Sequence, residues 1–303
     1  MMKKYILTLL ISGLIIPSLF AQEEKEPDTP VSNPFESGIL IDAQTTVIPD
    51  AKTLEFIIQH KFGSIENGSS DLWGIYGSSN IRVGLNYVPV KNFQIGAGIT
   101  KRKMMTDLNA KWTILKQTER STVPVSVALY GSIGIDGRSF DQLGGLGYTV
   151  DSKANDTPLQ SFGFTDRLSY YSQLIIGRKV TNALSVQVGT SFTHYNTVDW
   201  TDDHDVIGLH ANARLKFSPQ GSIIVTYDHP LKVKDISEQY TWDHMAEPNL
   251  AFGVEFFTFT HAFQMFVGSA DGILPMELMM NNGNPIKGKT FAIGFTITRL
   301  WMF

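Results

Sequence analysis

Three histidines in the second half of the chain each follow an aspartate. They occur in Asp203-His204-Asp205, Asp228-His229 and Asp243-His244. Imidazole and carboxylate groups are common ligands of zinc and other divalent ions, so His204, His229 and His244 are the candidate metal ligands. Their spacing matches no known metal motif, and Asp-His pairs are also ordinary in polar loops. The sequence therefore predicts no cofactor, with a metal site at these histidines as the alternative.

Nucleophilic hydrolysis is a second chemistry to consider, and it needs a Ser, a His and an orienting Asn or acid within reach. Ser191, His194 and Asn196 are the nearest such set. If residues 183–194 form a barrel strand, Ser191 faces the interior and His194 lies at the strand's end, so the register supplies no Ser-His pair. No Gly-x-Ser-x-Gly motif occurs either. The sequence therefore predicts that the protein is not an enzyme.

The remaining candidates are polar residues that alternate with apolar ones. As one face of a set of strands they would line a water-filled lumen, and the cations among them would set ion selectivity, in particular Arg82, Lys111, Arg214 and Lys216. The alternative is that these side chains bond to one another and seal the lumen. The candidate lumen residues are Arg82, Asn109, Lys111, Gln173, Arg178, His210, Arg214, Lys216 and Glu255.

The elements that must position these residues are strands, because side chains with a period of two lie on opposite faces of a strand. Residues 107–116 show the pattern: Leu108, Ala110, Trp112 and Ile114 fall on one face, and Asp107, Asn109, Lys111 and Thr113 on the other. A β-sandwich would also alternate, so alternation alone does not choose the fold. The predicted strands are 53–62, 78–88, 92–101, 107–116, 123–135, 167–179, 183–194, 206–217, 222–230, 249–258, 261–269 and 290–303.

The length and connection of these strands select the fold. Most are about ten residues long, which suits a tilted crossing of a bilayer, whereas soluble strands average about five or six residues. Long connections alternate with tight turns such as Ser-Pro-Gln-Gly, as in outer-membrane barrels. The predicted fold is all-β: a closed antiparallel transmembrane barrel of about twelve strands, with short periplasmic turns and long extracellular loops.

The last strand carries a further signal. Apolar residues alternate along it and the chain ends on a phenylalanine, a pattern that resembles the C-terminal signal by which bacterial barrels are recognised for insertion. Arg299 interrupts the apolar face and is expected near an interface, where a long basic side chain can reach water. The residues assigned to the insertion signal are Phe295, Ile297, Trp301 and Phe303.

The beginning of the chain predicts export. Lys3 and Lys4 precede a short apolar run that ends near the small residue Ala21, so residues 1–21 are predicted to be a signal peptide. Residues 22–52 are predicted to be a periplasmic tail, within which residues 35–48 form an extra strand or a plug, and residues 53–303 form the barrel. The chain has no cysteine and therefore no disulfide framework.

Composition excludes other classes of protein. A mean hydropathy of −0.03 excludes a polytopic helical membrane protein, which needs repeated apolar runs of about 20 residues. The formal net charge of −4 argues against nucleic acid as a partner. The expected partners are outer-membrane lipid and the barrel-assembly machinery.

Residues 273–280 form an unusually apolar connection that contains three methionines. Packing against the barrel rim is one interpretation of this segment. Folding inward as a plug, or binding a greasy ligand or partner, are the others.

Several stretches resemble an uncharacterised family of outer-membrane barrels from Bacteroidetes-type bacteria, a domain of unknown function. They are Gln59-His60-Lys61-Phe62-Gly63, residues 80–87, residues 168–179 and His261-Ala262-Phe263-Gln264-Met265-Phe266-Val267. Lys61 stands where the family is expected to have Arg. The resemblance implies the barrel fold and an outer-membrane location in a Gram-negative bacterium, and it implies no activity.

The function that this pattern favours is a pore or small-solute transport protein. The alternative is a non-conducting scaffold that binds partners through its long loops, especially residues 136–166 and 231–248.

Overall fold

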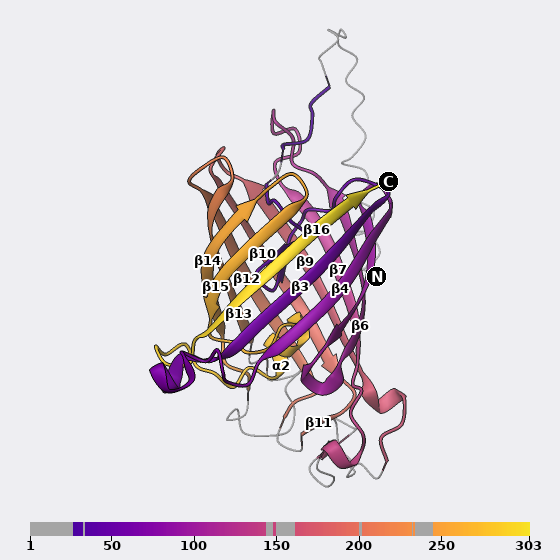
Figure 1. The fold of residues 1–303 in the computed structure, drawn as a ribbon. Helices are drawn as coiled ribbons and strands as arrows, with labels where there is room; N and C mark the ends of the chain where they lie inside the picture. The colour runs from indigo at the N-terminus through magenta and orange to yellow at the C-terminus, as the bar shows by residue number, and fades with distance from the viewer. Residues whose placement is uncertain are drawn as a thin grey trace, which may run out of the picture.

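The computed structural model describes residues 27–32, 34–143, 148–149, 161–199, 202–231, 233 and 245–303. Twelve strands of this structure close into one antiparallel barrel (Figure 1). The barrel strands are β3 Thr53–Ser64, β4 Asn80–Val90, β5 Phe93–Thr100, β6 Thr106–Leu115, β7 Ser126–Ile135, β9 Leu168–Lys179, β10 Leu184–Tyr195, β12 Asp205–Lys216, β13 Gly221–Leu231, β14 Asn249–Phe257, β15 His261–Gly268 and β16 Ala292–Met302.

The predicted closed barrel is confirmed. The largest shift of a strand start is at β7, which begins at Ser126 instead of residue 123. The ring closes between the first and last strands, where the register runs from Met302 opposite Thr53 to Ala292 opposite Ser64. Short turns gather at the upper end of the barrel in Figure 1 and the longer connections at the lower end. Since every strand has two partners, the barrel has no open sheet edge.

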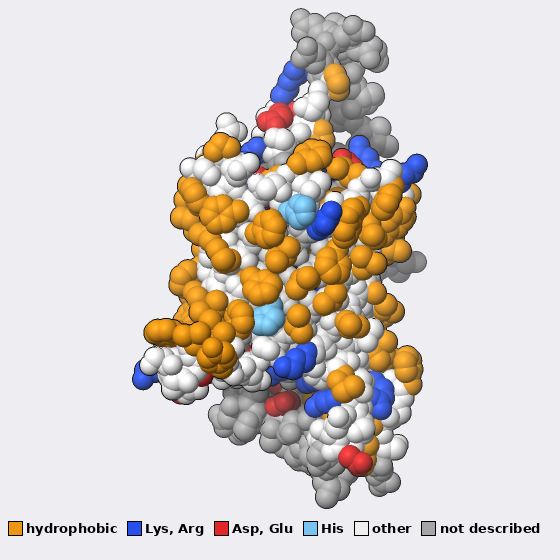
Figure 2. All heavy atoms as spheres, in the orientation of Figure 1, with side chains coloured by type: hydrophobic (Ala, Val, Ile, Leu, Met, Phe, Trp, Pro, Cys, Tyr) orange, Lys and Arg blue, Asp and Glu red, His pale blue; other side chains and the backbone are white. Residues whose placement is uncertain are grey.

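The strands alternate between an apolar outer face and a polar inner face. Along β9, for example, Tyr170, Leu174 and Ile176 are exposed on the outside, and Tyr171 and Gln173 are buried inside. Figure 2 shows apolar side chains spread over the visible barrel wall between its two ends. An exposed apolar surface of this extent matches the hydrocarbon of a bilayer.

Smaller elements lie in the connections. Two short β-pairs form outside the barrel ladder, β1 Ile39–Leu40 with β2 Ala43–Gln44 and β8 Tyr148–Thr149 with β11 Val198–Asp199. Among the described residues, the helical elements are the 3-10 turns η1 Ile65–Asp71, η2 Arg102–Met104, η3 Asp141–Leu143 and η4 Thr165–Arg167, and the α-helix α2 Pro275–Met280. No helix in the described part of the chain is long and apolar enough to cross a membrane.

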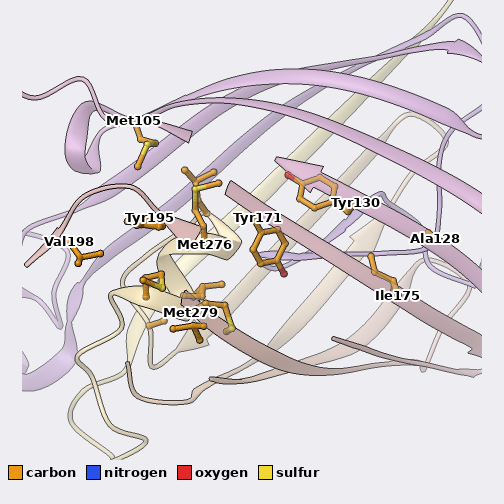
Figure 3. Packing of buried hydrophobic residues seen from close by; sticks show 14 residues of the cluster. Met105, Ala128, Tyr130, Tyr171, Ile175, Tyr195, Val198, Met276 and Met279 are labelled. Carbon is orange, nitrogen blue, oxygen red and sulfur yellow. The ribbon is translucent and has the colours of Figure 1, made fainter. Parts of the chain in front are cut away.

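Two chain segments fill the lumen, one from each end. The N-terminal plug, residues 34–48, enters from the end with the short turns and contains β1 and β2. The extracellular plug, residues 269–282, enters from the end with the long connections and contains α2. Each plug forms an apolar cluster with the wall, around Phe35, Leu40 and Ile41 in the first and around the methionines of α2 in the second (Figure 3).

Candidate functional site

The lumen wall carries charged side chains in equal numbers. Of the charged residues in the described barrel strands, four basic and four acidic ones are buried: Lys61, Arg82, Lys111, Arg214, Glu55, Asp107, Asp228 and Glu255. Buried charges need partners, because an unpaired ion inside a protein costs several kcal/mol. The partners of these eight residues reveal how the lumen is filled.

Arg82 on β4 finds its partner within the wall. Its Nε and Nη2 donate to the two carboxylate oxygens of Asp107 on β6, at 2.8 and 2.6 Å. Its Nη1 donates to Gln59 Oε1 at 3.2 Å. This two-pronged arginine–carboxylate geometry is the strong form of an ion pair. It leaves Arg82, a predicted lumen residue, fully engaged whether or not a plug is present.

Arg214 on β12 is shared between the wall and the N-terminal plug. Its Nε donates to Glu255 Oε2 of β14 at 2.8 Å, and its Nη2 donates to Glu36 Oε1 of the plug at 2.7 Å. Lys216 Nζ lies 3.3 Å from the same oxygen of Glu36. The second oxygen of Glu36 is buried and finds no hydrogen-bond partner among the described residues.

Lys111 on β6 bonds to the N-terminal plug. Its Nζ donates to the carbonyl oxygen of Gly38 at 2.9 Å and to Gln44 Oε1 at 3.3 Å. Gln187 on β10, three strands further along the ring, donates to the carbonyl oxygen of Gln44 at 2.6 Å. Two separate wall strands, β6 and β10, therefore hold the plug through its own backbone carbonyls.

Side chains of the wall also hold the turn of the N-terminal plug, through the backbone of Ile41. Ile41 has a φ of 59°, which is unfavourable for a β-branched residue. Its N–H donates to Gln264 Oε1 at 2.6 Å, and its carbonyl oxygen accepts from Gln59 at 3.2 Å and Thr296 at 3.1 Å. These bonds from three wall strands offset the cost of the strained turn.

Lys61 on β3 joins the two plugs. Its Nζ lies 2.5 Å from Asp42 Oδ2 in the N-terminal plug, and it donates to the carbonyl oxygens of Ala270 and Gly272 in the extracellular plug at 2.9 and 2.6 Å. The lysine is only 1% exposed. The alternation along its strand predicts Lys61 on the inward face, and the structure places it there.

The extracellular plug is folded inward, which answers the open question about residues 273–280. Met276 and Met279 are fully buried and lie in the cluster with Tyr171 and Tyr195 of the wall (Figure 3). Glu277 Oε2 accepts from the N–H groups of Ile273 and Leu274 at 3.0 and 3.3 Å. Burial raises the pKa of Glu277 above its usual range, although Arg102 and Lys103 oppose the shift.

The strand register does supply a Ser-His pair, so sequence analysis was wrong on this point. His210 Nε2 lies 2.7 Å from Ser191 Oγ, and His210 Nδ1 lies 2.7 Å from Asp228 Oδ1. Asn249 donates to the other oxygen of Asp228 at 2.9 Å. Ser191 stands opposite Gly208, and His210 opposite Gly189. The pair is therefore a diagonal contact between neighbouring strands, which spacing within one strand cannot reveal.

This network is ordered like a hydrolytic triad but lacks room for a substrate. A Cβ placed on Gly208 would lie 2.4 Å from Met279 Sδ and 2.6 Å from Ser191 Oγ, so the extracellular plug sits against the serine. The neighbouring backbone N–H groups belong to the barrel ladder and are not free to stabilise an oxyanion. The described arrangement therefore acts as a buried polar network that joins four strands, β10, β12, β13 and β14, beside the plug.

The two candidate metal ligands in the described part of the chain, His204 and His229, belong to no metal-binding group. His204 is buried and its Nδ1 lies 2.5 Å from the carbonyl oxygen of Tyr195, whereas the His229 ring stacks on Tyr227, 6.1 Å away. His244 lies outside the described residues. Among the described residues, no group of three His, Cys, Asp or Glu side chains could hold a metal ion. His194, the residue considered for hydrolysis, pairs instead with Asp205 at 2.6 Å and Asn196 at 3.0 Å.

Most predicted lumen residues face inward, but Arg178 does not. In β9, Gly177 is buried and Arg178 is exposed on the outer face, so its assignment to the lumen was wrong. Asn109 is half-buried and donates to Asp107 at 3.3 Å. Gln173 is buried, and its Oε1 finds no partner in the described part of the chain. Lys216 lies at the end of its strand with its side chain 32% exposed.

The residues assigned to the insertion signal lie on or beyond the outer face of β16. Phe295, Ile297 and Trp301 are half-buried against neighbouring strands, and Phe303 is 81% exposed. The Arg299 guanidinium lies 4.8 Å from the centre of the Trp301 ring, close to the strand's end as expected for an interfacial cation.

Two cavities flank the plugs. One of about 380 Å³ opens at the end with the short turns, between the N-terminal plug and the rim, and Glu36, Glu55 and Lys116 are among its lining residues. The other, of about 250 Å³, lies beside the extracellular plug and is lined by Lys103, Arg138 and other residues. Burial lowers the pKa of Lys103 to about 8. Both chambers end at plug residues, so in this state the plugs separate them.

One protein family matches most of the chain. Residues 35–301 match a family described as Membrane bound beta barrel domain (DUF5777). The chain belongs to this family. The match begins inside the N-terminal plug and ends in β16, so it includes both plugs as well as the twelve barrel strands. No curated protein sequence matches the chain.

Solved structures with a similar fold include a channel and two porins. The COG4313 outer membrane channel from Pseudomonas putida F1 is 12% identical, with a TM-score of 0.48, covering 84% of this chain and 97% of that one. The NanC porin is 7% identical, with a TM-score of 0.44 and coverages of 82% and 99%. The KdgM porin is 8% identical, with a TM-score of 0.42 and coverages of 83% and 99%.

Proposed function

We propose that this protein is an outer-membrane passage for small polar solutes, and that its two plugs close the passage in the state described here. The observation that carries the proposal is the composition of the lumen. The wall is polar and charged, while the space within it is occupied by two chain segments that enter from opposite ends. A barrel that served only as a rigid support would have no need of a polar wall behind its filling.

Several wall atoms support a lumen that also holds water. Gln187 Oε1, Asn212 Oδ1 and Thr226 Oγ1 are buried without a partner among the described residues. They lie in one row across β10, β12 and β13, because Gln187 pairs with Asn212 and Asn212 with Thr226. Buried polar atoms without protein partners are ordinarily satisfied by water. A hydrated strip along the wall is the expected lining of a solute path.

The second candidate function is a non-conducting scaffold, and the joining of the plugs favours it. Lys61 ties both plugs to the wall and is itself almost fully buried. A barrel whose plugs never leave would present its extracellular loops to a partner and conduct nothing.

Planar-bilayer recording of the refolded mature chain separates the two functions. We expect rare openings from the intact protein and sustained, discrete current steps from a deletion variant without either plug, in which residues 34–48 are removed and residues 269–282 are replaced by a short glycine–serine linker. Heat modifiability on gels verifies that both proteins are folded barrels. A folded deletion variant that carries no current would refute the passage and favour the scaffold.

The route to the membrane is part of the same proposal. Residues 1–21 are removed as a signal peptide during export, and the barrel-assembly machinery of a Gram-negative bacterium recognises the last strand. The stretches that resemble Bacteroidetes-type barrels support such a source. We propose membrane lipid and this machinery as partners, with no role for nucleic acid; the proposal includes neither catalysis nor a cofactor. Mass spectrometry of the N-terminus of the membrane-extracted protein tests the cleavage after Ala21.

A further inference from the structure

The wall cations and wall anions differ in where their partners come from. The carboxylates of Asp107, Asp228 and Glu255 each bond to a wall residue. Glu55 Oε2 likewise accepts from Asn86 and Gln94 of the wall, at 3.0 and 2.9 Å. Withdrawal of the N-terminal plug would therefore leave each of the four wall acids with a wall partner.

Three of the four wall cations contact the plugs, and only the fourth, Arg82, has all its described partners in the wall. Lys111 gives both of its described hydrogen bonds to the N-terminal plug, and Lys61 gives its contacts to the two plugs. Arg214 would keep Glu255 but lose Glu36. The wall holds equal numbers of acidic and basic groups, but opening the lumen would free the ammonium groups of Lys61 and Lys111 while every wall acid keeps a hydrogen-bond partner from the wall. Fixed charges in a narrow, low-dielectric passage select ions of the opposite sign.

The plug residues that meet two of these cations are themselves carboxylates. Glu36 lies between Arg214 and Lys216, and Asp42 faces Lys61. Each of these carboxylates is almost fully shielded from solvent. An arginine with a neighbouring lysine, as at Glu36, is a typical arrangement for binding a carboxylate.

The Glu36 position has a route to solvent. Glu36 lines the cavity at the end with the short turns, and its second carboxylate oxygen is buried without a partner among the described residues. A plug residue whose only role was structural would be expected to use both oxygens. The same space could accept the carboxylate of a solute that arrives through this cavity.

We propose that the solute is a small carboxylate anion, and that Glu36 and Asp42 occupy the positions at which its carboxylate groups bind in the open state. Arg214 with Lys216 forms one site and Lys61 the other, with Lys111 as an additional cation on the wall. The N-terminal plug is then a built-in competitor of the solute. This inference rests on the proposed passage and adds its solute class and its mode of closure.

Ion selectivity tests the inference directly. In the deletion variant without either plug, a potassium chloride gradient is expected to give a reversal potential with chloride favoured at least about threefold over potassium. Lys61→Gln with Arg214→Gln in the same background should bring the permeability ratio close to one. Arg178→Gln is the matched control, because it removes a positive charge from the outer face and should leave the ratio unchanged.

Competition tests the role of the plug. Succinate is expected to block the chloride current of the deletion variant at millimolar concentration. A synthetic peptide of residues 34–48 should block the current as well. The same peptide with Glu36→Gln and Asp42→Asn should need a concentration about tenfold higher for the same block. Both blocks should weaken in the variant with Lys61→Gln and Arg214→Gln.

The outcomes separate this inference from the proposed function. A current that prefers potassium would overturn the carboxylate sites and leave the passage standing. Chloride selectivity and succinate block that persist without Lys61 and Arg214 would do the same. Should the deletion variant not fold, full-length protein with Glu36→Gln and Asp42→Asn provides the same measurements. Silence from a folded barrel would overturn the passage, and the solute sites with it.

Discussion

A single buried lysine decides how tightly the lumen is closed. Lys61 meets one carboxylate and two carbonyl oxygens, and these belong to segments that enter from opposite ends of the barrel. Three acceptors satisfy the three N–H groups of an ammonium ion, so the residue is fully matched in the closed state. A mobile plug would have to separate Lys61 from Asp42, and only water or a solute anion could replace that contact.

Replacing Lys61 should loosen the closed state measurably. Lys61→Met leaves Asp42 buried without its cation, and removal of one partner of a buried pair costs about 3–5 kcal/mol. We expect a lower unfolding midpoint in urea and more frequent openings in bilayers. The double variant Lys61→Met with Asp42→Leu removes both charges and should recover most of the loss. Lys101→Ala, at an exposed lysine, is the control and should change stability by less than about 0.5 kcal/mol.

Glu277 makes the extracellular plug sensitive to pH. Burial raises its pKa when the plug is docked, so the docked state holds a proton more tightly than the released state. Its stabilising contribution is therefore present at low pH and is lost as the pH rises through the raised pKa. We expect openings to become rarer as the pH is lowered from neutrality toward the ordinary glutamate pKa of 4.5. Glu277→Gln should flatten the pH dependence of the opening frequency. If the pH dependence is unchanged in that variant, a group other than Glu277 causes it.

At the scale of elements, the N-terminal plug has little structure of its own. Its internal bonds are the pairing of β1 with β2, a bond from the Thr45 N–H to the Gly38 carbonyl oxygen at 3.0 Å, and short-range bonds of the Ser37 and Thr45 side chains. Most of its other polar contacts go to the wall. A two-stranded pair of this size is not stable alone in water, so the plug is ordered where the wall holds it.

A disulfide should lock the plug in place. Thr46 lies against β9, where a Cβ on Gly177 would be 3.1 Å from the Thr46 side chain, within reach of a bond between cysteines. The chain has no native cysteine, so Thr46→Cys with Gly177→Cys forms a single defined pair. We expect the oxidised protein to stay closed in bilayers and to regain openings on reduction. The single variant Thr46→Cys should be indifferent to reductant; openings unaffected by the disulfide would place the solute path elsewhere.

At the scale of the molecule, the barrel separates two environments. Its outer face is apolar, its inner face carries balanced charge, and the ring closes through β16 and β3. Hydrogen bonds between neighbouring strands hold the strands that carry Arg82 and Asp107 in place. The plugs lie inside the barrel and are not part of its sheet. The barrel and its filling can therefore respond differently to mutation.

The end of the last strand should matter for assembly more than for stability. Phe303 is 81% exposed, so Phe303→Asp removes little packing and should alter the unfolding midpoint of the refolded protein by less than about 0.5 kcal/mol. If the chain end is an insertion signal, the amount of folded barrel in outer-membrane fractions should fall several-fold. Equal yields of wild type and variant in cells would remove that role from Phe303. Met302→Asp provides a neighbouring control.

The sequence alone determined the strands, their number and the alternation of long and short connections, because a period of two is a local property. Arg178 shows the limit of that reasoning: it was grouped with Gln173, although the two differ in parity, and only residues an even number apart share a face. The lumen residues Arg82, Lys111 and Arg214 followed from the same pattern.

Tertiary structure decided what fills the barrel. The bond from Ile41 to Gln264 joins residues 223 apart in the chain, and that from Lys61 to Gly272 joins residues 211 apart. The Ser191 contact to His210 depends on the register between two strands. No local pattern encodes such contacts, because they arise only when the ring closes and burial forces each polar group to find a partner. The plugs, and the closed state they create, are consequences of that closure.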